Sequence, residues 1–231
     1  MKKLLILPIL FCGLGLSAQQ TAFVETNPNP AKIIKETIAL EGSTAITLEF
    51  PYATDIRLTN APGSEIEVYV NASINNGENN EAYELLIEKE GDQILLGTDR
   101  ARLDSFFKKN SGRQNNCYST DIMVEVSIPS GMLVFVESIS GSVTGELRDK
   151  PYTIKTISGD IGLSVPSGIG AEVIASTISG AMYADITLDF LDGKEGLNQI
   201  VGEKIHANIN KGGELHRLET ISGDVLLRSR K

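Results

Sequence analysis

The tripeptide Ile157-Ser158-Gly159 decides the predicted fold, because it returns at residues 139–141, 178–180 and 221–223. The copies begin 18, 21 and 43 residues apart, and a degenerate copy at Ile200-Val201-Gly202 divides the longest interval. A small-residue turn between apolar positions, repeated at a near-constant spacing, is typical of stacked structural repeats. The pattern predicts an all-β fold, a single-stranded β-solenoid (β-helix) with coils of about 18–22 residues.

Apolar residues recur after each turn at steps of two, as on one face of a β-strand. The first such column reads Val143, Ile161, Met182, Ile205 and Val225. We expect these columns and the isoleucines of the turns to form a buried ladder, so that Ile157→Asp unfolds the protein whereas Ser158→Ala does not. Glycine should supply turn angles that other residues adopt only with strain, at five structural positions: Gly141, Gly159, Gly180, Gly202 and Gly223.

The N-terminus has the features of a secretory signal peptide, predicted as residues 1–18. Lys2 and Lys3 precede an apolar run from Leu4 to Leu16, and Ser17-Ala18-Gln19 offers a small-residue cleavage site. The run is too short for a transmembrane helix, and no other stretch qualifies. The protein is therefore expected to be exported to the periplasm, to the outer-membrane surface or into the medium.

Composition limits the choice of partners. The chain has 30 acidic and 21 basic residues and a formal net charge of −9, which argues against binding to nucleic acid. Only Cys117 remains after removal of the signal peptide, so no internal disulfide is expected. The chain contains no Trp, which argues against an aromatic-lined sugar groove.

The N-terminal half, residues 19–130, is predicted to be a β-strand region that caps the repeats of residues 131–231. Alternation of apolar and polar residues indicates strands at 45–50, 65–70 and 122–128. The turn signal Glu90-Gly91-Asp92 predicts a hairpin between strands at 83–87 and 93–96.

A basic loop at residues 99–120 interrupts this pattern and is the predicted ligand-binding segment. Long loops often carry function, and basic residues with aromatic neighbours could hold an anionic sugar or a protein partner. The alternative is a solvated excursion whose phenylalanines pack on the sheet. The candidate residues are Arg100, Arg102, Phe106, Phe107, Lys108, Lys109 and Arg113.

The sequence predicts no catalytic residue, metal site or cofactor. Asp160 and Asp224 share a turn position, but the predicted coil order places them three coils apart, too far for a carboxylate pair. His206 and His216 fall on predicted strands and have no zinc-like spacing. The acidic group Asp185, Asp189 and Asp192 lacks the ligand pattern of a calcium loop. One hydroxyl column before the turns could face a regular ligand, or it could hydrogen-bond the turns themselves: Ser138, Thr156, Thr177 and Thr220.

The signal peptide, the strand ending Val126-Ser127-Ile128-Pro129 and the Ile-Ser-Gly-Asp turns at 157–160 and 221–224 together resemble the bacterial putative-adhesin family. The resemblance extends from Thr37 to the C-terminus. It implies an exported β-solenoid protein. The flat, repetitive faces expected of such a rod, the secretion signal and the lack of a catalytic pattern favour a non-enzymatic protein that acts in cell-envelope interaction or adhesion. A glycan or an envelope or host-surface protein would be the partner. A carbohydrate-active β-helix enzyme and a periplasmic scaffold or signalling partner are the alternatives.

Overall fold

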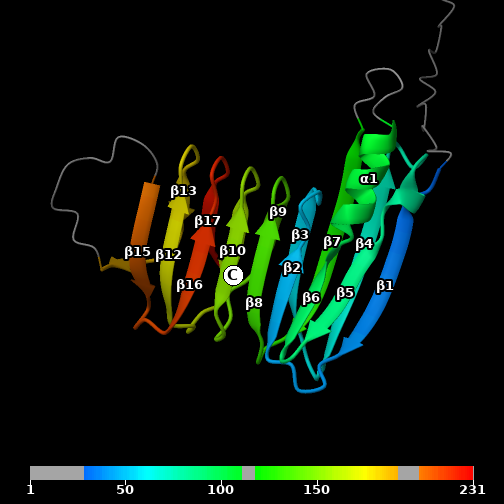
Figure 1. Ribbon diagram of the computed structural model, residues 1–231. Helices are drawn as coiled ribbons and strands as arrows, with labels where there is room; N and C mark the ends of the chain where they lie inside the picture. Colours follow the sequence, from blue (N-terminus) through cyan, green and yellow to red (C-terminus); the bar gives the residue numbers. More distant parts are fainter. Residues whose placement is uncertain (1–28, 111–117, 192–202, 231) are drawn as a thin grey trace, which may run out of the picture.

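Two β-sheets packed face to face form the fold in the computed structural model, which describes residues 29–110, 118–191 and 203–230 (Figure 1). The eight-stranded sheet contains, in spatial order, β1 (Lys32–Ala39), β4 (Glu65–Ile74), β7 (Thr120–Pro129), β3 (Asp55–Ala61), β9 (Ser142–Glu146), β11 (Ile161–Val165), β17 (Val225–Ser229) and β13 (Met182–Ala184). The nine-stranded sheet contains β14 (Leu188–Phe190), β15 (Glu203–Ile209), β12 (Ala171–Thr177), β16 (Glu214–Glu219), β10 (Tyr152–Thr156), β8 (Leu133–Ser138), β2 (Ala45–Glu49), β6 (Gln93–Thr98) and β5 (Leu85–Glu90).

The predicted single-stranded β-helix is wrong, because these two mixed sheets make a sandwich-like fold whose strand order does not follow the chain. The last strand, β17, lies between β11 and β13, and β3 lies between β7 and β9. Antiparallel pairs occur at both ends of the molecule, for example β1 with β4 and β12 with β15. Near-identical strand–turn–strand units offer each other near-identical edges, so the repeat does not fix which unit becomes a neighbour.

Register within the parallel pairs places equivalent positions side by side. Ile161 is the Cα partner of both Val143 and Val225, and Val225 is also the partner of Met182. Ile205, expected in the same column, instead faces Ala175 in an antiparallel pair. The residues that follow the degenerate copy therefore do not form another parallel unit. Residues 200–202 themselves lie outside the described residues.

The core lies between the two sheets and receives every second side chain of most strands. Ile46, Val136 and Ile154 from the nine-stranded sheet and Ile56 and Ile161 from the eight-stranded sheet are fully buried. Burial of each such side chain contributes about 1.5–3 kcal/mol to stability. Strands from both halves of the chain join each sheet, since β2 pairs with β8 and β3 with β9.

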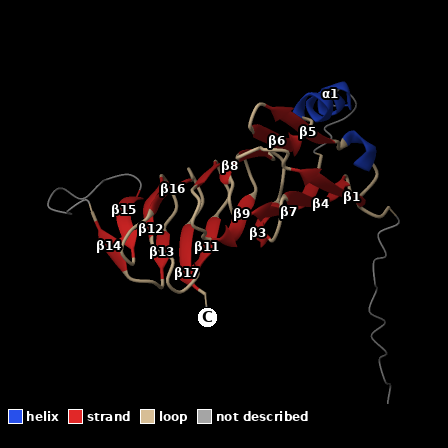
Figure 2. Cartoon of the chain, turned by 90° about the horizontal axis from the view of Figure 1, so that it is seen from below, coloured by secondary structure: helices blue, strands red, loops and turns tan. Residues whose placement is uncertain are grey.

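The strands predicted at 45–50, 65–70 and 122–128 are confirmed as β2, β4 and β7, and the predicted hairpin is β5–β6. Segment 99–120 differs from the expected loop, because it contains helix α1 (Arg100–Asn110). The Asp99 carboxylate caps this helix by accepting a hydrogen bond of 2.9 Å from the Arg102 backbone N–H. Figure 2 shows α1 beside β5 and β6, at the end of the molecule opposite β14. A short 3₁₀ helix, η1 (Asn80–Ala82), precedes β5.

Candidate functional site

The turn glycines are required by close approach of backbones. A Cβ added to Gly159 would lie 1.9 Å from the Gly141 carbonyl oxygen, and one on Gly223 would lie 2.1 Å from that of Gly159. A Cβ added to Gly180 would lie 1.8 Å from the Gly223 carbonyl oxygen. None of the four described turn glycines has positive φ, so the expected role in unusual turn angles is wrong for them. Gly202 lies outside the described residues.

The hydroxyl column is internal and ties each turn to its neighbour. The Thr156 hydroxyl accepts a hydrogen bond from the Gly159 N–H at 3.0 Å and donates to the Gly141 oxygen at 3.4 Å. Thr220 makes the same two contacts with Gly223 and Gly159, at 3.1 and 3.0 Å. Ser138 and Thr177 repeat the arrangement, and all four side chains are buried. The column therefore serves the turns and does not face a ligand.

Since the hydroxyl residue points inward, the isoleucine that follows it points outward. The expectation that these isoleucines are buried is wrong: their exposed fractions are 37% (Ile139), 44% (Ile157), 43% (Ile221) and 53% (Ile178). They lie just beyond the C-terminal ends of β8, β10, β16 and β12, and they follow one another in that order at steps of about 4.8 Å. We call these four residues the isoleucine row.

A groove of about 600 Å³ runs along the isoleucine row. Two residues before each isoleucine lies an outward side chain of the nine-stranded sheet, and these side chains form the second wall. We call Glu49, Glu137, Lys155 and Glu219, which are successive Cα partners, the charged row. Ser176 continues that wall beside Ile178, and Pro51, Thr98 and Arg100 line the opposite end of the groove.

The side chains of the charged row form no ion pairs with one another, although Lys155 is the Cα partner of both Glu137 and Glu219. Within the described part of the chain, no ion pair or side-chain hydrogen bond involves any of its four members. Three carboxylates and one ammonium group therefore give this wall a net negative charge. The groove combines an apolar wall with an acidic one.

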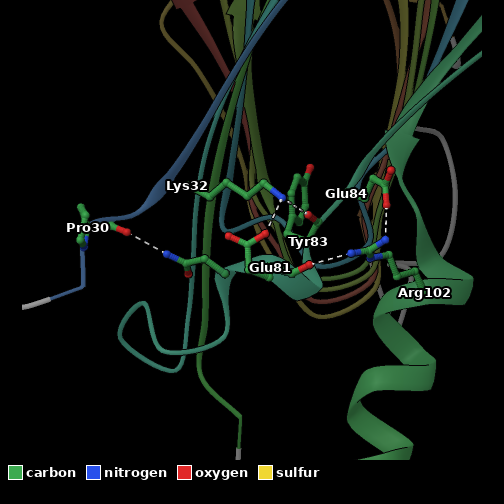
Figure 3. Close-up of polar contacts among 7 residues, drawn as sticks. Pro30, Lys32, Glu81, Tyr83, Glu84 and Arg102 are labelled. Carbon is green, nitrogen blue, oxygen red and sulfur yellow. Dashed lines mark hydrogen bonds and ion pairs between the residues drawn. The ribbon is translucent and has the colours of Figure 1, made fainter.

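The predicted ligand-binding residues divide between the groove and helix contacts. Arg100 lines the groove and forms an ion pair of 3.5 Å with Asp104. Arg102 instead binds the segment around η1, through an ion pair of 2.6 Å with Glu84 and a hydrogen bond of 3.0 Å to the Glu81 carbonyl oxygen (Figure 3). Lys32 contacts the same segment at the carbonyl oxygen of Tyr83, at 2.9 Å.

The remaining candidates lie farther along α1. Phe106 and Phe107 are partly buried and belong to an aromatic cluster, in which the Phe107 ring lies 5.0 Å from that of Tyr118 and 6.0 Å from that of Tyr52. Lys108 and Lys109 occupy the last helical turn, where positive charge interacts favourably with the helix dipole. Arg113 lies outside the described residues. The structure thus brings Arg100 to the groove and leaves the binding role of the other candidates as a prediction.

The two histidines occupy strands, as predicted, and lie apart. His206 lies 2.6 Å from the Glu172 carboxylate. His216 is fully buried, and its Nδ1 accepts a hydrogen bond of 3.2 Å from the Tyr152 backbone N–H. Burial, with a smaller contribution from the nearby Arg148 guanidinium, lowers the pKa of His216 to about 4. The described residues contain no group of three potential metal ligands.

Asp160 and Asp224 lie on neighbouring strand units, because β11 pairs with β17, so the expected separation of three coils is wrong. The Asp160 carboxylate accepts a hydrogen bond of 2.8 Å from the Asp224 backbone N–H. Asp224 in turn accepts one from the Ala181 N–H, also at 2.8 Å. Both carboxylates therefore satisfy backbone donors of the turns.

The outward isoleucines could have been found in the sequence. Val134, Val136 and Ser138 alternate as inward residues, and continued alternation turns Ile139 outward. The same count holds for Ile154, Thr156 and Ile157. The apolar character of isoleucine suggested burial, although strand geometry indicated exposure.

Among the described residues, no helix has the length and apolar character needed to cross a membrane. No family model matches the chain, and no curated protein matches it in sequence. Among solved structures, a putative adhesin from Bacteroides fragilis aligns over 86% of this chain and 97% of its own, at 10% identity and a TM-score of 0.25. A putative adhesin from Parabacteroides merdae aligns over 87% and 97%, at 9% identity and a TM-score of 0.26.

A putative cell adhesion protein from Clostridium sporogenes matches 87% of this chain and 100% of its own, at 11% identity and a TM-score of 0.53. This likeness concerns the fold, since few residues are shared. The resemblance to putative adhesins inferred from the sequence is thereby confirmed at the level of the fold, which this chain shares with the Clostridium protein.

Proposed function

We propose that this chain is a non-enzymatic exported protein of the cell envelope or surface that holds its partner in the groove beside the isoleucine row. The observation that carries the proposal is four half-exposed isoleucines side by side, lining a groove together with three carboxylates and one ammonium group. Contiguous exposed apolar side chains on a soluble protein mark interaction sites, because their burial by a partner is favourable. Scattered single residues would need no such explanation.

Two further facts support a binding role. The Clostridium protein that shares the fold is named as a putative cell adhesion protein. In the described part of the chain, Asp160 and Asp224 bind backbone N–H groups and His216 is enclosed in the core, so these side chains are engaged in the fold itself. Export rests on the predicted signal peptide at residues 1–18, which lies outside the described residues.

A carbohydrate-active enzyme is the alternative of a different class, and the groove gives it one candidate pair. Glu49 and Glu137 are Cα partners, and glycosidases use two carboxyl groups about 5–10 Å apart. A general acid, however, needs a sheltered site that favours its protonated form, and both side chains are exposed. We expect no turnover of alginate or hyaluronan by the wild type. Turnover that Glu49→Gln abolishes would favour the enzyme.

Site-specific photo-crosslinking in the producing cells tests the binding role. A photoreactive amino acid replaces Ile157 in the groove, and in a control it replaces Thr144, which lies on the outer face of the eight-stranded sheet. We expect a discrete crosslinked species from position 157 and none from position 144. Equal yields at the two positions, or no product at 157, would contradict the groove as the binding site.

Protease treatment of intact cells separates a surface protein from a periplasmic scaffold. Loss of the protein while a known periplasmic protein remains intact would place it at the surface. Protection of both would favour the periplasmic alternative, with the groove still available to a partner there.

A further inference from the structure

We propose that the groove binds an extended cationic peptide segment in which aliphatic and basic side chains alternate. This inference rests on the proposed function and adds the chemistry of the partner. It follows from the two unlike walls of the groove, since a ligand must satisfy the isoleucine row and the charged row together.

The charged row selects for positive charge. Glu49, Glu137 and Glu219 lack ion-pair partners among the described residues, and Lys155 is the one basic member of the row. Lysine or arginine side chains of a ligand would pair with the three carboxylates. Since the whole chain carries a net charge of −9, long-range attraction also favours a basic partner.

Three other ligand classes fit the groove less well. An acyl chain would satisfy the isoleucine row, but it would remove water from the carboxylates without offering a hydrogen bond. An anionic lipid headgroup would be repelled by the carboxylates. A glycan would find no aromatic side chain in the lining on which to stack its rings.

The backbone around the row is already paired, so a ligand cannot be held as an added β-strand. The Ile139 and Ile157 carbonyl oxygens accept hydrogen bonds from the backbone N–H groups of Ser158 and Ser222, at 2.8 and 2.9 Å. The Ile221 oxygen accepts from the N–H of Ser179, at 2.8 Å. Recognition must therefore come from side chains, which makes their order in the ligand decisive.

Spacing in an extended peptide fits the two rows. Alternate side chains of a strand point to opposite sides, and those on one side are about 6.6–6.8 Å apart. The isoleucine row spans three strand spacings of about 4.8 Å. This length is close to two same-side intervals of an extended peptide. A segment of about six residues thus places its aliphatic side chains on the isoleucine row and its basic side chains on the charged row.

Fluorescence anisotropy with labelled synthetic peptides tests this chemistry on the purified mature protein. The probe is an eight-residue peptide of alternating Lys and Val, used at low micromolar concentration. Its controls are a block peptide of four Lys followed by four Val and an alternating Glu–Val peptide. We expect the block peptide to bind at least about tenfold more weakly, because it cannot satisfy both walls at once, and the acidic peptide not to bind.

Groove variants assign the binding to the two rows. Glu137→Gln should weaken binding of the alternating peptide about two- to fivefold, and Lys155→Glu should strengthen it by a similar factor. The gain is informative because a misfolded variant cannot produce it. Ile157→Ser should also weaken binding. Glu125→Gln and Met123→Ser, on the outer face of the eight-stranded sheet, are matched controls expected to bind like the wild type.

Equal binding of the alternating and block peptides, or no response to Glu137→Gln and Lys155→Glu, would overturn the inference. Crosslinking from position 157 distinguishes failure of this inference from failure of the proposed function. A crosslinked species with no peptide binding would mean that the groove holds a partner of another chemistry. The absence of both would remove the groove from the function altogether.

Discussion

The hydroxyl of Thr220 donates a hydrogen bond to the carbonyl oxygen of Gly159, 3.0 Å away and 61 residues earlier in the chain. The same hydroxyl accepts from the Gly223 N–H within its own turn. One oxygen thus closes a turn and joins it to its neighbour. Because each hydroxyl residue is inward and buried, the isoleucine after it is forced to the surface, and the groove follows from this internal bonding.

Thr220→Val should destabilise the protein by about 1–3 kcal/mol, since valine keeps the shape but leaves the Gly159 oxygen and the Gly223 N–H without a partner. Thr220→Ser retains the hydroxyl and should lose much less. Urea unfolding followed by circular dichroism measures both changes. Equal midpoints for the valine and serine variants would show that the hydroxyl bonds contribute little.

Gly159→Ala should destabilise by about 1–3 kcal/mol or prevent folding, because its Cβ would lie 1.9 Å from the Gly141 carbonyl oxygen, and backbone cannot move aside cheaply. Gly162→Ala is the matched control. Its Cβ would meet only the Thr144 Cγ2 atom, at 3.7 Å, which is an ordinary contact. The thermal midpoint of the control should stay close to that of the wild type, and a comparable loss in both variants would refute the close-approach explanation.

Ile157→Asp should leave the protein folded, with a loss below about 1 kcal/mol, because this side chain is 44% exposed. Ile161→Ala, only four residues later, should cost about 2–5 kcal/mol, because Ile161 is fully buried between the sheets. Chemical denaturation of the two variants distinguishes the walls of the groove from the core. If Ile157→Asp unfolded the protein, the isoleucine row would have to be part of the buried core.

Strand positions could be predicted from the sequence, but strand order could not. Alternation in the segments around Ile46, Val68 and Val126 identified β2, β4 and β7, because one buried face imposes a period of two. β11 pairs with β17, and their Cα partners Ile161 and Val225 are 64 residues apart in the chain. The four units with an Ile-Ser-Gly turn also share a hydroxyl residue before it and an apolar column after it, so these features do not select one neighbour over another.

The sequence did not predict the groove, because the isoleucines were assigned to the core by their hydrophobicity and not by their position in the strand alternation. Ile139 and Ile157 looked like core residues by hydrophobicity, yet their place in the alternation is outward. The helix was missed for a related reason: Leu103 is fully buried within a segment whose charges suggested a loop. For the isoleucines the local alternation was sufficient to indicate exposure, whereas the burial of Leu103 depends on tertiary packing.

Lowering the pH should destabilise the protein through His216. Its pKa is about 4 in the folded protein, against an ordinary value near 6.5, because the buried ring is costly to charge and Arg148 lies nearby. Between pH 6.5 and 4 the unfolded chain binds a proton at this residue that the folded chain does not. The free energy of unfolding should therefore be greatest above pH 6.5 and fall by about 3 kcal/mol by pH 4, after which this contribution levels off.

His216→Asn isolates this contribution, because its side-chain oxygen can still accept the hydrogen bond of the Tyr152 N–H but does not titrate. The variant should be less stable than the wild type at pH 7, owing to lost packing volume, yet its stability should fall less steeply between pH 6.5 and 4. NMR titration of the His216 ring in the wild type gives the folded-state value directly. A midpoint near 6.5, together with parallel pH profiles for the two proteins, would mean that the ring reaches solvent and that the acid sensitivity arises elsewhere.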